Sequence, residues 1–272
     1  MTLAEYIKIN ITDTFAAIPL SSCLIVKERL ITDGMSHAVM MAVPYPHGAG
    51  RIASFARLRD YHAFFASFEE EIRSLLGERY PGCSVGVFSD HSPIDERGAA
   101  VRAGLGVRGD NGLFITEKYG SFVFLGEIVC SLGKKDLISE GIEVKDDGDG
   151  ECLHCGICAS LCPAECIGGD KSLCISALTQ KKGLLSDTEC DIIRSGKSAW
   201  GCDICGACCP MNEEKTAAYN EFFLNETIDP KHASDIETMS DEDFAKYPFS
   251  WRRRETIIRN FNIIDSHGES DD

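Results

Sequence analysis

Four cysteines near the middle of the chain have the spacing of an iron–sulfur ligand run. Cys152, Cys155, Cys158 and Cys162 are separated by two, two and three residues, and Pro163 follows the last of them. Bacterial ferredoxins bind cubane clusters through this run, and the cysteine before proline turns away to hold the other cluster. Zinc sites also use paired cysteines, but a triplet followed by Cys-Pro is poorly explained by zinc. The run therefore predicts two four-iron clusters.

A second cysteine run supplies ligands for the same two clusters. Residues 202–210 read CDICGACCP, and a cysteine again precedes a proline. By the crossing of the ferredoxin run, we expect the first cluster to bind Cys152, Cys155, Cys158 and Cys209. We expect the second cluster to bind Cys162, Cys202, Cys205 and one further cysteine. The candidates for that eighth ligand are Cys166, Cys174, Cys190 and Cys208.

Spacing alone does not choose the eighth ligand. Cys208 has the ferredoxin-like offset, whereas Cys174 lies in a separate segment that could fold back. We interpret Cys166 and Cys190 as bystanders. The three cysteines of the preceding region, which have apolar neighbours in the sequence, are predicted to be buried inert thiols: Cys23, Cys83 and Cys130.

Composition indicates a soluble globular protein in a reducing compartment. Hydrophobic residues make up 44% of the 272 residues and charged residues 26%. No apolar run is long enough to span a bilayer, and the N-terminus lacks a signal-peptide pattern, so we predict a cytoplasmic location without membrane attachment. Metal ligation explains the fourteen cysteines better than disulfides do. The net charge is −16, whereas most proteins that bind nucleic acids display a basic surface, so the charge argues against nucleic-acid binding.

Strand and helix patterns alternate before the cysteines. We expect helices where apolar residues recur at helical spacing, at 3–10, 58–77 and 93–105. Ser92 is expected to cap the last of these helices, with Pro93 at its first position. Short apolar runs predict strands at 37–45, 83–90, 112–116 and 121–129.

These patterns predict an α/β (α+β) protein in three parts. Residues 1–147 are expected to form a reductase domain around a mixed sheet. Residues 148–213 are expected to form a ferredoxin-like domain that holds both four-iron clusters, after the acidic linker KDDGDGE. Residues 214–272 are expected to form a helical tail that packs back on the domains.

Several stretches of the chain resemble the epoxyqueuosine reductases. GRIASFARLRDYH (50–62) is similar to the run of that family that ends in Arg-Asp-Tyr-His. SDHSPIDERGAAVRAGLG (89–106) is similar to its Asp-x-x-Pro-x-x-Glu-Arg segment, and YGSFVFLGEI (119–128) to its Gly-Ser-aromatic strand. LCISALT (173–179), CDIC and WRRRETIIRN (251–260) extend the likeness, which covers residues 40 to 260 or so. One difference is Asp110, which stands where the family typically has a lysine.

The resemblance implies a cobalamin-dependent iron–sulfur reductase that acts on a modified tRNA base. It favours Cys174 as the eighth ligand, and it implies that Asp90 is the proton donor. A carboxyl group donates a proton only if its pKa is raised, as burial beside an apolar corrin would do. The resemblance also places several residues near the cofactor: Asp60, Tyr61, His62, Gly120 and Ser121.

Without the resemblance, Asp90 is better explained as a helix cap or as a turn residue before Pro93, and a structural ion pair explains Glu96 and Arg97 as well as a catalytic role does. The sequence thus leaves three hypotheses. The first is an epoxyqueuosine reductase-like enzyme that receives electrons from an external flavodoxin or ferredoxin. The second is a reductase of the same architecture that acts on a small molecule or a corrinoid protein. The third is a ferredoxin-like electron carrier that has no activity on tRNA.

Overall fold

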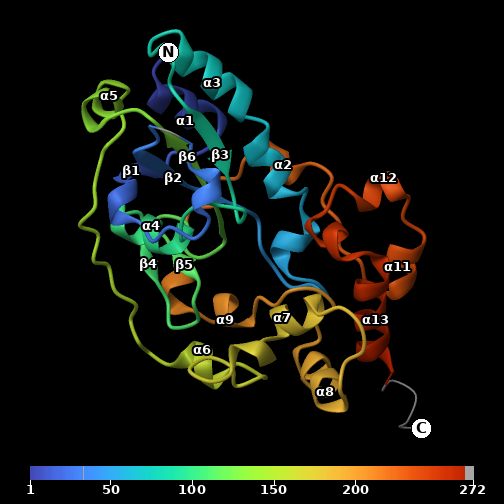
Figure 1. The fold of residues 1–272 in the computed structure, drawn as a ribbon. Helices are drawn as coiled ribbons and strands as arrows, with labels where there is room; N and C mark the ends of the chain where they lie inside the picture. Colours follow the sequence, from blue (N-terminus) through green and yellow to red (C-terminus); the bar gives the residue numbers. More distant parts are fainter. Residues whose placement is uncertain (33, 267–272) are drawn as a thin grey trace. The chain divides into compact units, whose positions relative to one another are not determined.

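The computed structural model describes residues 1–32 and 34–266, and the chain forms two compact units (Figure 1). The sheet unit comprises residues 1–45, 61–153 and 214–220. The cysteine unit comprises residues 46–60, 154–213 and the part from 221 onward. Within the described ranges, no helix is long and apolar enough to cross a membrane. The division into three domains that the sequence suggests, at 1–147, 148–213 and 214–272, stays a prediction.

The sheet unit confirms the α/β prediction. Its main sheet has the strand order β1-β2-β6-β3, and all of its neighbouring strands are antiparallel. One isolated parallel bridge joins Ala17 to Val144 at the β1 edge. The elements of this unit are β1 (Phe15–Pro19), β2 (His37–Pro44), β3 (Val85–Phe88), β4 (Val107–Arg108), β5 (Phe114–Ile115), β6 (Val123–Cys130), α1 (Leu3–Asn10), α2 (Tyr61–Ala66), α3 (Glu69–Gly77), α4 (Glu96–Arg102) and α5 (Lys134–Ser139).

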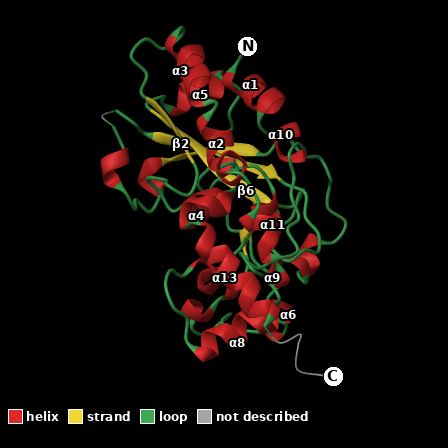
Figure 2. Ribbon diagram, turned by 90° about the vertical axis from the view of Figure 1, so that its right-hand side faces the viewer, coloured by secondary structure: helices red, strands yellow, loops and turns green. Residues whose placement is uncertain are grey.

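The central strands β2 and β6 are covered on both faces (Figure 2). On one face, Met40 and its neighbours pack against the alanines of α4. On the other face, Met41 pairs with Gly126 of β6, and the ring of Phe65 from α2 lies directly over that glycine. A Cβ at Gly126 would come within 2.3 Å of the Phe65 ring. The glycine therefore sets how closely α2 approaches the sheet.

The structure differs from the sequence prediction in three places. The helix expected over 58–77 is broken into α2 and α3, and the Ser67 hydroxyl at the break donates 2.7 Å to the carbonyl of Phe64. The helix expected from residue 93 begins at Glu96. Ser92 is not its cap, because its hydroxyl accepts the N–H of Ile94 at 3.0 Å in the preceding turn. Strand β1 was not predicted, although its residues, FAAIP, are mostly buried.

The cysteine unit is helical and has a core of its own. Trp200, Phe249 and Phe261 are buried together in it. The fully buried Asn260 donates to the carbonyls of Thr179 at 2.7 Å and Ala199 at 2.8 Å. Its helices are α6 (Ile157–Ser160), α7 (Ile175–Gln180), α8 (Asp187–Gly196), α9 (Ile204–Ala207), α10 (Glu221–Leu224), α11 (Ala233–Glu237), α12 (Asp241–Phe244) and α13 (Arg254–Asp265).

Candidate functional site

Asp90 lies in the loop between β3 and α4, and its backbone has the left-handed conformation, with φ of 58°. This conformation is uncommon for a residue other than glycine. Its carboxylate accepts a short hydrogen bond from the Tyr61 hydroxyl, and Nε2 of His62 lies 3.6 Å from the same oxygen. The backbone N–H of Asp90 donates 2.7 Å to Oε1 of Glu96. Sequence-distant residues of the candidate site thus meet at one carboxylate.

A stack of aromatic rings holds Tyr61 in place. Its ring lies 4.3 Å from that of Phe124 on β6, with 13° between the planes, and 4.2 Å from the His62 imidazole. Tyr45 extends the stack on the other side of Phe124, again at 4.3 Å. Stacked rings of this kind stabilise their arrangement beyond the area that they bury. The stack gives Asp90 a rigid apolar flank.

The pKa of Asp90 differs from the expected direction. Partial burial acts to raise it, but the contacts with His62 and Tyr61 outweigh burial and hold the pKa below its usual range. The carboxylate side chain is 61% exposed, so it does not lie in an apolar pocket in this structure. Asp90 is therefore ionised at neutral pH in this state, and the raised pKa beside a bound corrin stays a prediction.

The other predicted cofactor residues lie in different places. Gly120 has φ of 70° and exchanges backbone hydrogen bonds with Thr116 in a tight turn before β6. Ser121 follows in that turn and is 7% exposed. Asp60 belongs to the cysteine unit, where its N–H donates 2.8 Å to the carbonyl of Lys246. Tyr61 and His62 are thus the predicted cofactor residues that contact Asp90.

The expected ligands of the second cluster converge within the cysteine unit. Cys162, Cys174 and Cys202 pack around the same small apolar core. Burial raises the pKa of Cys205 to about 12, and the charges of Cys202, Cys174 and Cys162 nearby add to the increase. Four thiolates this close together need positive charge between them, which iron would supply. The donor set fits a cubane cluster.

Cys162 is the cysteine of this group whose surroundings favour a thiolate. Burial acts to raise its pKa, but the backbone N–H groups of Cys166, Ala164 and Ile167 point at the sulfur and lower the pKa overall. Hydrogen bonds from N–H groups to a cluster sulfur are among the features that tune iron–sulfur sites. The chain after Cys-Pro thus forms a cradle for an anionic sulfur.

Two cysteines outside the expected ligand set lie beside it. The sulfur of Cys166 is 3.5 Å from the sulfur of Cys162, and Cys166 is 6% exposed. Cys208, on the other hand, is close to Cys209 and Cys155. Burial is the main cause that raises the pKa of Cys208, and the charges of Cys209 and Cys155 add to it. It therefore neighbours ligands expected for the first cluster. Of Cys174 and Cys208, between which spacing did not choose, Cys174 is the one that packs with Cys162 and Cys202.

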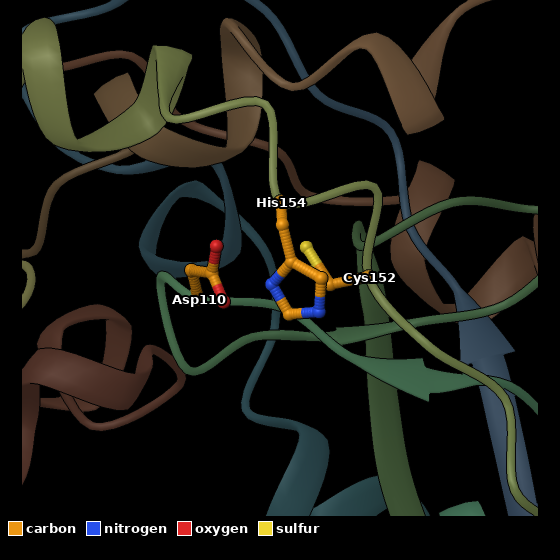
Figure 3. Close-up of side chains that lie close together, drawn as sticks. All are labelled: Asp110, Cys152 and His154. Carbon is orange, nitrogen blue, oxygen red and sulfur yellow. The ribbon is translucent and has the colours of Figure 1, made fainter.

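The ligands expected for the first cluster are divided between the two units. Cys158 on α6 and Cys209 after α9 belong to the cysteine unit, and α6 packs against α9. Cys152 closes the sheet unit, where its sulfur lies within 4.8 Å of a carboxylate oxygen of Asp110. Figure 3 shows the side chains of Asp110, Cys152 and His154, which lie close together. A carboxylate beside Cys152 adds negative charge next to an expected ligand.

Glu127 is a residue that motif spacing did not single out. It is fully buried in β6, and within the described part of the chain neither of its carboxylate oxygens has a hydrogen-bond partner. Glu96 and Ser92 are near enough to shift the pKa of its carboxyl group. The signal in the sequence was a lone charge inside the apolar run FLGEIV.

Comparison with known proteins gives one consistent result. No protein-family model matches the chain. Over 235 residues it is 34% identical to an epoxyqueuosine reductase of Cyclobacterium marinum, covering 82% of this chain and 70% of that protein. The counterpart in Gloeobacter violaceus is 29% identical over 240 residues, covering 85% and 71%. The counterpart in Staphylococcus aureus is 28% identical over 249 residues, which cover 84% of this chain and 63% of that protein.

Solved structures agree on the fold. An epoxyqueuosine reductase from Bacillus subtilis, whose catalytic aspartate loop is swung out of the active site, matches 97% of this chain and 80% of its own, with a TM-score of 0.73 and 21% identity. An epoxyqueuosine reductase bound to an epoxyqueuosine-modified tRNA-Tyr stem loop matches 89% and 68%, with a TM-score of 0.70 and 23% identity.

Fold and sequence likeness together define an oxidoreductase. The similarity of the sequence to the Cyclobacterium protein extends over most of both chains. The chain belongs to the epoxyqueuosine reductase family, as the sequence motifs predicted.

Proposed function

We propose that this protein reduces epoxyqueuosine in tRNA, with electrons that pass through two four-iron clusters to a cobalamin-type site and with Asp90 as the proton donor. The observation that carries the proposal is the contact of Tyr61 and His62 with the Asp90 carboxylate, in a chain that also gathers a cubane donor set. An external flavodoxin or ferredoxin is the expected electron donor.

The cysteines fit two clusters. Cys162, Cys174, Cys202 and Cys205 would hold the second cluster, since the first three pack around one small core and their charges act on Cys205. The first cluster would take Cys152, Cys155, Cys158 and Cys209. Cluster binding requires thiolates, and the N–H cradle around Cys162 supports one of them. The role of these side chains is to bind iron and to set how easily it is reduced.

The sheet unit carries side chains that suit a corrinoid, although they define its site less closely than the cysteines define the cluster sites. Tyr61, His62, Gly120 and Ser121 would hold it, because they combine a flat aromatic stack with a tight turn that carries a small residue. When bound, a reduced corrinoid supplies low-potential electrons for removal of an epoxide oxygen. Conversion of an epoxide to an alkene consumes two electrons and two protons and releases water.

Asp90 is the side chain that would give a proton to the departing oxygen. Its pKa is low in the exposed state, so donation requires that a bound substrate cover the carboxylate and remove water from it. Tyr61 and His62 would hold the carboxylate in place meanwhile.

The substrate assignment rests on the named relatives. They are called epoxyqueuosine reductases, and one related structure contains a modified tRNA stem loop. A small-molecule reductase or a plain electron carrier is not favoured by any of these comparisons. A plain electron carrier also has no use for the contacts of Asp90 with Tyr61 and His62.

Complementation tests the proposal in cells. The wild-type chain is expected to restore queuosine to the tRNA of a strain that lacks its own epoxyqueuosine reductase, and Asp90→Asn is expected not to. Asp149→Asn, a change in the exposed linker, is the matched control and should restore queuosine. Failure of the wild-type chain, with both clusters and a corrinoid present in the purified protein, would contradict the substrate assignment.

A further inference from the structure

Glu127 is buried where an ionised carboxylate is not stable. It has no exposed surface, and within the described residues its oxygens lack hydrogen-bond partners. A buried, unpaired carboxylate is so costly that the group takes up a proton instead. Burial accordingly raises the pKa of Glu127 well above its usual value, and the charges of Glu96 and Asp90 raise it further. These surroundings favour the protonated, neutral form of Glu127.

Glu96 connects this buried acid to the Asp90 loop. It is the first residue of α4, and its Oε1 accepts the backbone N–H of Asp90 at 2.7 Å. That hydrogen bond is made at the residue whose backbone is left-handed. Burial raises the pKa of Glu96 to about 7, and the charge of Asp90 adds to the increase.

The charged surroundings of the two glutamates are mostly acidic. Glu96 faces Asp90 from the loop and Glu127 from β6, and its cationic neighbour is Arg97 on its own helix. Glu127 faces Glu96, Asp90 and the Ser92 hydroxyl, and Cys23 also lies within its electrostatic reach. Two carboxylates in such surroundings do not both ionise at neutral pH.

We propose that Glu96 and Glu127 form a carboxyl pair that retains one proton at neutral pH, and that Glu96, as the carboxylate of the pair, is the positioning residue that holds Asp90 through its backbone N–H. This inference rests on the proposed role of Asp90. A hydrogen bond to a charged acceptor is stronger than one to a neutral acceptor. The hydrogen bond from Asp90 to Glu96 is therefore strong above pH 7. It weakens below pH 7, when Glu96 is protonated and the pair carries two protons.

Hydrogen exchange tests the pair without any need for turnover. The measurement follows backbone exchange of residues 89–92 by mass spectrometry between pH 5.5 and 8.5, corrected for the intrinsic exchange rate. Protection of this segment in the wild-type protein is expected to fall about fivefold as pH drops through 7, the ratio between a charged and a neutral acceptor. Glu96→Gln keeps an oxygen acceptor but does not titrate, so its protection is expected to stay constant with pH.

Glu127→Gln separates the two members of the pair. A neutral amide in place of the neutral acid leaves burial and the charge of Asp90, the two causes that raise the pKa of Glu96, so the midpoint of the pH response is expected to stay near that of the wild type. Glu70→Gln, an exposed change on α3, is the control and should follow the wild type. Identical pH responses in wild type and Glu96→Gln, or a wild-type response that is flat, would overturn the inference. If the wild-type protein shows the expected pH response but does not reduce epoxyqueuosine, the proposed function fails and the inference about the Asp90 loop stands.

Discussion

The sulfur of Cys166 lies 3.5 Å from the sulfur of Cys162. Each iron corner of a cubane takes its own thiolate, and the four thiolates point away from one another. Two sulfurs in contact do not occupy two corners of one cluster. We therefore expect Cys166 to lie beside the second cluster rather than to bind it, and Cys174, which packs in the same small core, stays the predicted ligand.

Iron content distinguishes these cysteines. Cys174→Ala is expected to remove one corner ligand of the second cluster and to lower the iron of the purified protein by up to about half. Cys166→Ala and Cys208→Ala are expected to keep the wild-type amount. Colorimetric iron and sulfide assays on anaerobically reconstituted protein measure this. Loss of a cluster in Cys208→Ala with retention in Cys174→Ala would reverse the assignment.

Replacement of Asp90 tests the proton donor. Asp90→Asn keeps the shape but cannot give a proton, so turnover is expected to drop by about 100-fold or more while both clusters remain. Cluster absorption and iron content report on integrity. Unchanged turnover would remove Asp90 from the mechanism.

Tyr61 is expected to set the pH range of that donor. Tyr61→Phe removes the hydroxyl that stabilises the Asp90 carboxylate, so the pKa of Asp90 rises. Because the donor must be protonated, the decline in turnover at high pH is expected to move to higher pH. A profile that coincides with that of the wild type would show that Tyr61 does not act on Asp90 during turnover.

Gly126 is expected to be intolerant of any side chain. Gly126→Ala puts a methyl group into the Phe65 ring, which requires α2 to move from the sheet. Overpacking of this kind costs about 1–3 kcal/mol of unfolding free energy. Activity should fall as well, since Tyr61 and His62 are carried on α2. Denaturant unfolding measures the cost, and Gly77→Ala is the control because a Cβ there meets no neighbouring atom. Equal stability of both variants would contradict the packing argument.

The buried glutamates are expected to make the sheet unit less stable as pH rises. The pKa of Glu96 is near 7 in the folded protein and about 4.5 when unfolded, so between these values the folded state binds more protons. Its contribution to the free energy of unfolding is therefore full below pH 4.5 and declines up to pH 7 and slightly beyond. Glu96→Gln should flatten this part of the curve in denaturant titrations at several pH values. A variant whose curve parallels that of the wild type would refute the shifted pKa.

The sequence predicted elements whose patterns were local. The helix at 3–10 and the strands that became β2, β3 and β6 follow from apolar periodicity, and the structure confirms them. The break between α2 and α3 did not follow, because it depends on Ser67 bonding to Phe64 within an apolar pattern that runs on. The late start of α4 at Glu96 depends on a turn made by Ser92.

The site divides along the same line. Cysteine spacing predicted a cluster unit, whereas the choice of Cys174 over Cys208 came from family resemblance and stays a prediction, which the packing of Cys174 with Cys162 and Cys202 supports. The approach of Tyr61 and His62 to Asp90 joins segments 29 residues apart, which only the folded sheet brings together. Spacing also could not reveal that Asp90 is exposed with a lowered pKa, or that Glu127 is the carboxyl group whose pKa burial raises.

The most direct test is turnover on the nucleic acid itself. The protein, reconstituted anaerobically with iron, sulfide and cobalamin, is incubated with a chemical reductant and a stem loop that carries epoxyqueuosine, and the nucleosides are analysed by mass spectrometry. The account predicts conversion to queuosine, with the loss of one oxygen atom, by the wild-type protein and none by Asp90→Asn. A fully loaded wild-type protein that leaves epoxyqueuosine unchanged would contradict it.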